Sequence, residues 1–382
     1  MKNRALAVLV ALVLMACGET DSGGSGTGFG QFKDSNTSGL SYVSGDISRV
    51  TSADGSFEYT VGEPVIFSVG GVTLGTTNGK AVVTPLDLVD GGSSSSPAVQ
   101  NIVRFLMMLD SNGDPSDGIT ISSLVQEAAV DWPPVAFDDA TRFDTDLSTS
   151  LDAANEADPV HAGNRTLVNA VAAQSHLEST LLCSYAGAYE GTFSGDDRGS
   201  FGILVDATSG EVRGVANSDI DQVPFELTGD SPITFDQNVS FVSGHISSGA
   251  TFSGQFDSVN GLSGTWENAP DGGSFSGSRI GGAADAQYRF TGTFSTGAGS
   301  VHEGLITFDI NGANEVTGKV YDSVDDELLS LSGSVLGTVL TATVGGSVTV
   351  TGTLDRETGT LSGTWNDENE SGSFTGSGCR LN

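Results

Sequence analysis

The C-terminal half of this chain contains two copies of a unit of about 100 residues, and this duplication limits the possible folds more than any other feature. GLSGTW at 261–266 recurs within GTLSGTW at 359–365, and GSFSGS at 273–278 recurs as GSFTGS at 372–377. YEGTFS at 189–194 likewise corresponds to TGTFS at 291–295. Trp266 and Trp365 are 99 residues apart, as are Phe275 and Phe374. Two copies of this length indicate tandem domains, because a solenoid needs more and shorter repeats.

Each unit has the pattern of an all-β domain. Phe201, Ile203 and Val205 alternate with small residues, and Val348 and Val350 alternate with threonines. Turn pairs such as Asn-Gly at 260–261 and 311–312 recur at hairpin spacing. The pattern predicts seven or eight antiparallel strands that close into a small barrel, with a two-sheet sandwich as the alternative. In style these units resemble the barrels of lipocalins and avidins, although neither family's diagnostic motif is present.

The N-terminus carries an export signal. Lys2 and Arg4 precede a short apolar run that ends in Leu-Met-Ala at 14–16, directly before Cys17. This segment resembles the lipobox of bacterial lipoproteins. The resemblance implies that residues 1–16 are a signal peptide, that Cys17 carries lipid, and that the protein is anchored in the outer membrane by that lipid. Which face of the outer membrane it occupies stays open, and an ordinary signal peptide with a chance cysteine is the alternative.

Residues 37–183 are expected to form one domain of strands followed by helices. The segment 56–60 alternates with period two, and it follows the sequence Thr-Ser-Ala-Asp-Gly-Ser-Phe at 51–57. That sequence resembles the T-x-x-D-G-x-F signature of carboxypeptidase-regulatory-like, transthyretin-like β-sandwich modules, which serve as stalks or spacers. Apolar residues at helical spacing then predict helices from Pro97, over 122–130, over 138–155 and over 164–182, the last with Asn164 as its cap.

The expected fold class is therefore mainly β with a helical insert: a small N-terminal β-sandwich, a helical segment, and two tandem barrels. Residues 17–36 are rich in Gly, Ser, Thr and Asp, and they predict a flexible tether. The expected domain organisation is signal peptide 1–16, tether 17–36, sandwich and helices 37–183, first β repeat 184–282 and second β repeat 283–382.

The chain is strongly acidic, with a net charge of −33. Cleavage before Cys17 removes two basic residues and leaves 13 basic against 48 acidic groups. Such a protein repels nucleic acid, so we exclude nucleic acid as a partner. The charge favours cationic surfaces or divalent cations as partners, and solubility in a saline medium is the plainer alternative.

Three cysteines occur in the chain. With Cys17 assigned to lipid, Cys183 and Cys379 remain, and two thiols in an oxidising compartment most simply form a disulfide. This bridge would link the two ends of the repeated half.

Two groups of residues are candidate ligand sites. Asp110, Asn112, Asp114 and Asp117 place oxygen atoms at the spacing of a calcium loop, although position 12 is Ile121 where a closing Glu is needed. An Asp/Asn-rich turn is the alternative. Trp266 and Trp365 end alternating strands and are candidates for ligand stacking, whereas aromatic plugs that fill the barrel ends are the alternative.

Catalytic signatures are missing from the sequence: there is no G-x-S-x-G, no S-x-x-K and no H-E-x-x-H. The histidines, at 161, 176, 245 and 302, are scattered singly. We therefore expect a lipid-anchored, non-catalytic binding or adhesion module, with a surface glycan or a protein as its ligand. The alternative is an exported carboxylate-dependent hydrolase with structural calcium.

Overall fold

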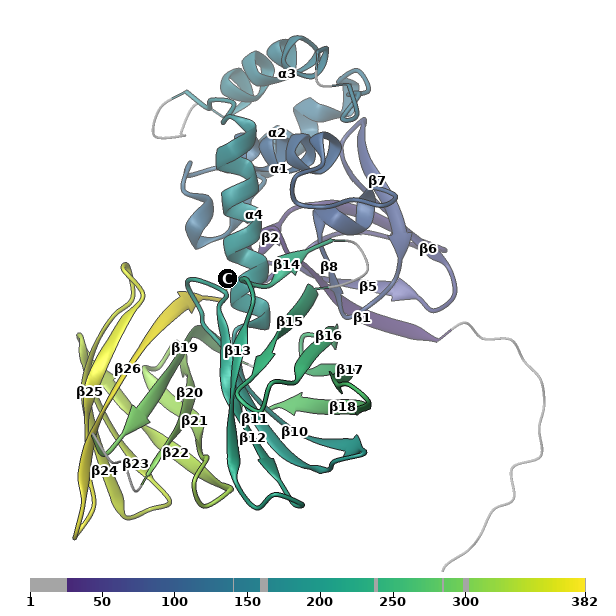
Figure 1. The fold of residues 1–382 in the computed structure, drawn as a ribbon. Coiled ribbons are helices and arrows are strands. Elements are labelled where there is room, and N and C mark those ends of the chain that lie inside the picture. The colour runs from purple at the N-terminus through teal and green to yellow at the C-terminus, as the bar shows by residue number, and fades with distance from the viewer. Residues whose placement is uncertain are drawn as a thin grey trace, which may run out of the picture.

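The computed structural model describes residues 26–381 except 140, 159–163, 237–239, 284 and 298–301 (Figure 1). The expected signal peptide and Cys17 lie outside the described residues, as does His161. The fold is mainly β, as predicted. An N-terminal region of small sheets and helices precedes two closed, eight-stranded antiparallel barrels, and the sandwich alternative for the repeats is wrong.

The N-terminal region contains three small sheets. In the first, β1 pairs with β5 and β8; in the second, the strand order is β4-β3-β6-β7; in the third, β2 pairs with β9. The turn at Asp54-Gly55 precedes β5 as expected, and Gly55 has a φ of +79°, which favours glycine. The strands are β1 Thr27–Phe32, β2 Thr37–Ser38, β3 Ser41–Ser44, β4 Ile47–Val50, β5 Ser56–Thr60, β6 Pro64–Val69, β7 Val72–Asn78, β8 Val82–Val83 and β9 Ile119–Thr120.

The expectation of a tether over 17–36 is wrong for its last part, because β1 already begins at Thr27. Phe32, at the end of this strand, is fully buried in the N-terminal core. Gly28 and Gly30 let the rings of Tyr59 and Phe57 lie across the strand, since a Cβ atom at either glycine would meet those rings within 2.4 and 2.7 Å. The glycines that suggested flexibility therefore serve close packing.

Helices cover the sheets of the N-terminal region, and α1 supplies Ile102, Phe105 and Leu106 to the same core as Phe32. The last helix begins later than expected: its cap is Asn169, whose side chain accepts from Ala172 N at 2.9 Å, and not Asn164. Residues 164–169 stay outside the helix because Arg165 forms a buried ion pair with Asp158 at 2.7 Å. The helices are α1 Pro97–Leu109, α2 Ser123–Ala128, α3 Phe143–Ala157 and α4 Ala170–Tyr185, with 3₁₀ turns η1 Pro85–Leu88, η2 Pro115–Asp117 and η3 Ala129–Asp131.

The first barrel follows α4 directly and is closed by the pairs β10–β18 and β13–β15, with β14 as an added edge on β15. Its strands are β10 Gly187–Gly195, β11 Gly199–Val205, β12 Val212–Ser218, β13 Pro224–Gly229, β14 Thr234–Phe235, β15 Ser240–Ile246, β16 Thr251–Ser258, β17 Gly261–Asn268 and β18 Asp271–Arg279.

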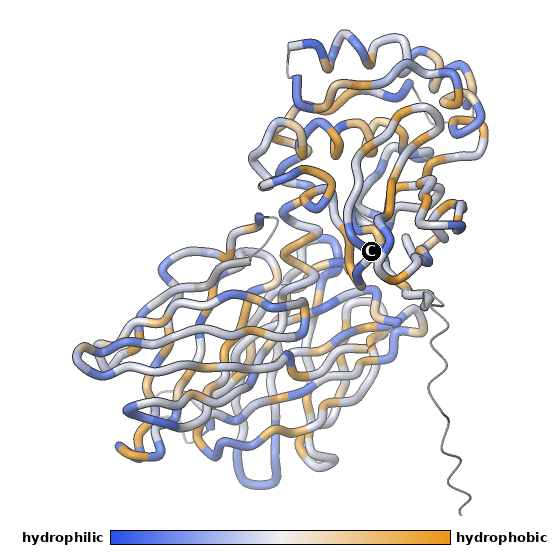
Figure 2. The backbone as a smooth tube through the Cα atoms, turned by 90° about the vertical axis from the view of Figure 1, so that its right-hand side faces the viewer, coloured by the Kyte–Doolittle hydropathy of each residue, from blue (hydrophilic) through white to orange (hydrophobic). Residues whose placement is uncertain are grey.

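The second barrel is a meander of eight strands that closes by pairing β19 with β26. Its strands are β19 Ala286–Ser295, β20 Glu303–Asn311, β21 Glu315–Asp322, β22 Glu327–Leu336, β23 Val339–Val344, β24 Val348–Asp355, β25 Thr360–Asn366 and β26 Ser371–Arg380. Strands of both barrels alternate between apolar and polar residues, and Figure 2 shows hydrophilic turns at the barrel ends.

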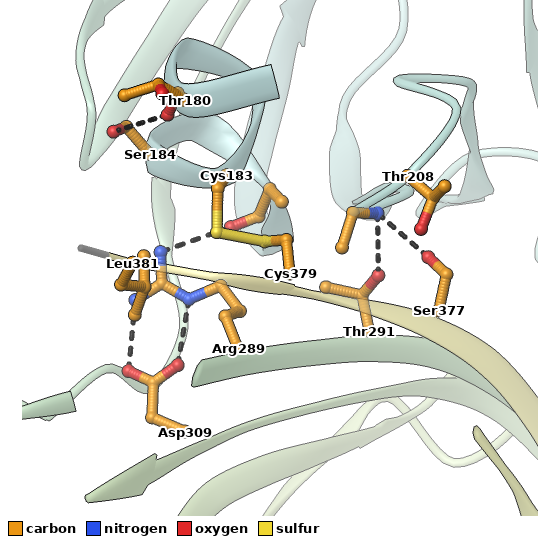
Figure 3. The surroundings of a disulfide bond; sticks show 12 residues. Thr180, Cys183, Ser184, Thr208, Arg289, Thr291, Asp309, Ser377, Cys379 and Leu381 are labelled. Carbon is orange, nitrogen blue, oxygen red and sulfur yellow. Dashed lines mark hydrogen bonds and ion pairs between the residues drawn. A yellow bond between two sulfur atoms is a disulfide. The ribbon is translucent and has the colours of Figure 1, made fainter. Parts of the chain in front are cut away.

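The predicted disulfide is present and joins Cys183 on α4 to Cys379 on β26, with a Cα–Cα distance of 5.7 Å (Figure 3). Beside it, Arg289 forms a two-point ion pair with Asp309, at 2.8 and 3.0 Å, and both side chains are buried. Arg289 also donates to the carbonyl oxygen of Ala186, at the end of α4. The second barrel is thus attached to the helix by a covalent bond and by the hydrogen bond from Arg289, whose guanidinium is held by Asp309.

Candidate functional site

The barrel ends nearest α4 are filled with side chains. In the first barrel, the Tyr189 hydroxyl donates to Tyr185 O at 2.7 Å, and Phe256 lies against both rings, with centroids 5.3 and 5.2 Å away. In the second barrel, Phe290 and Phe308 stack with centroids 5.4 Å apart. Any space inside the barrels therefore opens at the opposite ends, where β10 and β19 finish.

The first barrel contains a cavity of about 280 Å³ that opens at this free end. Six aromatic side chains line it, and four of them are only half-buried although they lie inside the barrel. They are Phe193, Phe201, Phe225, Phe252, Trp266 and Phe275. The second barrel has a smaller cavity of about 190 Å³ with only three aromatic residues in its wall, Phe294, Trp365 and Phe374.

Strand register explains this difference in lining. Gly191 faces Phe201 in the first barrel, whereas the corresponding Gly292 faces Ile306 in the second. The same comparison matches Phe225 with Leu329 and Phe252 with Val350. Three inward-facing phenylalanines of the first repeat are therefore aliphatic in the second, and the first cavity is the more aromatic one.

Acidic residues surround the mouth of the first cavity. Asp196, Asp197, Asp221 and Asp271 all contribute to its wall, and none of the described lining residues is basic. Asp196 accepts from Gly272 N at 2.9 Å and Asp197 from the Ser218 hydroxyl at 3.0 Å, so two of these carboxylates are fixed in position. An anionic ligand would be repelled at this entrance.

The structure places both candidate tryptophans in the cavity walls, and neither fills the end of its barrel next to α4. Trp266 donates through Nε1 to Ser194 O at 3.2 Å and meets Phe193 edge to face. Trp365 meets Phe294 in the same way but is buried. This placement fits the stacking hypothesis, and ligand contact by either residue stays a prediction.

The mouth of the second barrel holds His302 among carboxylates. Its Nδ1 lies 2.7 Å from Asp322 Oδ2 and 3.6 Å from Asp325 Oδ2, and its Nε2 lies 3.4 Å from Glu370 Oε2. The hydrogen bond with Asp322 raises the pKa of His302, and the charges of Asp322, Glu370 and Asp325 act in the same direction. In the sequence His302 stands alone, because its neighbours come from distant segments. The pairing of β20 with β21, which places Gly304 opposite Asp322, brings them together.

The candidate calcium residues are close together but largely bind one another. Asn112 donates to both oxygens of Asp117 at 3.1 Å, and Asp114 accepts from Ser116. Asp110 is buried and accepts from Thr120 N at 2.9 Å, and burial raises its pKa. These bonds are those of an Asx-rich turn between α1 and β9. A calcium ion would have to displace the Asn112–Asp117 contact, and calcium at this loop stays a prediction.

The two other described histidines differ in setting. His176, on α4, is largely buried, and its Nε2 lies 3.4 Å from Asp34, a fully buried carboxyl in the N-terminal region. Burial lowers the pKa of His176 to about 4 and raises the pKa of Asp34. His245 is exposed on β15 and lies 2.6 Å from Asp230. Neither of these two histidines belongs to a barrel cavity.

No protein-family model matches the chain, and no curated protein matches it. Among solved structures it is similar to isotype 1 transferrin-binding protein B from serogroup B Neisseria meningitidis, with a TM-score of 0.20 and 11% identity over 47% of this chain and 51% of that one. A DUF3598-family protein of unknown function from Nostoc punctiforme has a TM-score of 0.13 and 11% identity over 53% of this chain and 98% of that one. The chain spans about half the length of the Neisseria protein. Among the described residues, no helix is long and apolar enough to cross a membrane.

Proposed function

We propose that this protein is a lipid-anchored, non-catalytic binding protein of the outer membrane, and that its first barrel holds a small aromatic ligand that is neutral or cationic. The observation that carries the proposal is the cavity in the first barrel, where six aromatic side chains surround open space. The second barrel has the same strand plan but a smaller cavity, with three aromatic residues in its wall. The aromatic lining is therefore a property of one repeat and not of the fold.

The volume of the cavity fits a ligand of one or two rings. A dry apolar cavity of about 150 Å³ is enough to bind benzene in another protein, and ligand pockets begin at about 300 Å³. The first cavity, at about 280 Å³, lies between these values. Edge-to-face contacts already exist between Phe201 and Phe275 and between Phe252 and Phe275, and a bound ring would extend this network.

The acidic mouth sets the charge of the ligand. The four aspartates at the entrance repel an anion, and they attract a positive group that remains outside while the ring enters. Fatty acids and similar anions are therefore excluded as preferred ligands. The acidic mouth is compatible with a cationic group on a partner's surface, such as a lysine side chain of a protein.

Two fluorescent probes with the same ring system test this proposal. 1-Naphthylamine has two rings and is neutral at pH 7, and 5-aminonaphthalene-1-sulfonate adds one negative charge to the same rings. We expect the neutral probe to bind one site, and the sulfonate to bind at least about tenfold more weakly, because tenfold corresponds to only about 1.4 kcal/mol of repulsion. Higher salt should reduce the difference in affinity between the two probes, since it screens exposed carboxylates. Equal affinity for both probes at low salt would contradict the charge argument.

A matched pair of variants locates the binding site. Ala216 and Val320 occupy equivalent positions, one in each cavity wall. We expect Ala216→Phe to abolish binding of the neutral probe by filling the first cavity, and Val320→Phe to leave it unchanged. Circular dichroism and melting curves check that both variants fold. Binding that survives Ala216→Phe in a folded protein would refute the site. Turnover of a glycan or an ester that a single Asp or Glu substitution abolishes would favour the hydrolase alternative.

A further inference from the structure

The free end of the second barrel brings together four side chains from three separate segments. His302 precedes β20, Asp322 and Asp325 lie at the β21–β22 turn, and Glu370 precedes β26. His302 Nδ1, an Asp322 oxygen and an Asp325 oxygen all lie within 4.8 Å of one another. Asp322 is held in place because its other oxygen accepts from Val324 N at 2.9 Å.

Among its described lining residues, the mouth of the first barrel carries carboxylates at equivalent positions but no histidine. By strand register, the positions equivalent to His302 and Asp322 hold Asp197 and Ser218, which form a simple hydroxyl–carboxylate hydrogen bond of 3.0 Å. Asp325 and Glu370 correspond to acidic residues, Asp221 and Asp271. Both mouths therefore carry carboxylates, but only the second combines them with an imidazole.

We propose that His302, Asp322 and Asp325 form a binding site for a divalent transition metal of the zinc class, with Glu370 orienting the imidazole. Ligand atoms around zinc, at about 2.0–2.2 Å from the metal, are roughly 3.3 Å apart in a tetrahedron. The Nδ1 distances to the two aspartates, 2.7 and 3.6 Å, bracket this value, so small side-chain rotations are sufficient.

Glu370 has the role that carboxylates commonly have beside metal-bound histidines. A carboxylate that accepts from one ring nitrogen fixes the tautomer and leaves the lone pair on the other nitrogen for the metal. Glu370 Oε2 lies on the Nε2 side of His302, whereas both aspartates face Nδ1. The metal replaces the proton shared between Nδ1 and Asp322, and water completes its coordination at the open mouth.

The ligand set selects against calcium and magnesium. Those hard cations take oxygen ligands only, whereas an imidazole with two carboxylates suits zinc and its neighbours in the transition series. The site is independent of the proposed aromatic ligand, because it lies in the other barrel. Either proposal therefore stands if the other fails.

Calorimetric titration of the purified, chelator-treated full chain with zinc chloride tests the site. We expect one zinc ion per chain, loss of this binding in His302→Ala, and a roughly tenfold loss of affinity in Glu370→Gln, the usual size for an orienting residue. His245→Ala is the matched control, because it removes an exposed histidine that faces a single aspartate. Calcium at the same concentration should not compete.

A second measurement needs no variant: in nuclear magnetic resonance spectra of the unmodified protein, zinc should shift the imidazole signals of His302 before those of the other histidines. Unchanged zinc affinity and stoichiometry in a folded His302→Ala protein would overturn the proposal. Equal competition by calcium, or zinc shifts confined to His245, would overturn it as well.

Discussion

Removal of the disulfide between Cys183 and Cys379 should lower stability by an amount that its position allows us to work out. The bridge closes a loop with a sequence separation of 196 residues, which contains both barrels. The chain-entropy relation for a loop of this length gives about 5 kcal/mol at 25 °C, with native strain as the main reason for a smaller value. For a unit of about 200 residues, 1 kcal/mol shifts Tm by about 2–4 °C, so the expected fall in Tm is roughly 10–20 °C.

The variant to test is Cys183→Ala with Cys379→Ala. Alanine is preferred to serine because a serine would leave a buried, unpaired hydroxyl beside α4. Scanning calorimetry should compare this variant with the oxidised parent and with the parent under reducing conditions. The last two samples separate loop closure from side-chain changes, since reduction alone should reproduce most of the fall in Tm. The circular dichroism spectrum of the folded variant should match that of the parent, because the hydrogen bond from Arg289 to the Ala186 carbonyl still joins the barrel to the helix. A double variant that melts within about 3 °C of the oxidised parent would refute the reasoning.

Three further outcomes are expected. Arg289→Ala should destabilise the protein by about 3–5 kcal/mol in urea unfolding, because it leaves the Asp309 carboxylate buried without its partner, and a loss below about 1 kcal/mol would contradict this. The pKa of His302, measured by nuclear magnetic resonance in metal-free protein, should lie above 6.5, and it should fall in Asp322→Asn because the hydrogen bond with Asp322 raises it. The charged form of His302 therefore stabilises the folded protein fully below pH 6.5, and this contribution disappears as the pH rises through the folded-state pKa. Cys17→Ser should abolish incorporation of an alkyne-labelled palmitate, and labelling that persists would remove the lipoprotein assignment.

Local signals in the sequence were sufficient for the architecture of the C-terminal half. The period-two alternation and the turn pairs are local in the sequence, so they predict strands without information from distant segments. The two copies of the Gly-Thr-Phe and Gly-Thr-Trp segments then fixed two equivalent units. The bridge between Cys183 and Cys379 followed from counting, because the lipobox resemblance assigns the third cysteine, Cys17, to lipid.

Boundaries and sites depended on contacts between distant segments. Residues 27–32 form a strand because β5 supplies aromatic rings that pack over the glycines of β1. Helix α4 starts after Asn169 because Arg165 is bound to Asp158. His302 and Glu370 are 68 residues apart in the chain, and only the closure of the barrel brings them to one mouth. The alternation of apolar and polar residues is enough to tell which side chains face inward. Whether those side chains fill the barrel or leave a cavity depends on the combined volumes of side chains from eight strands, and only the closed barrel brings these together.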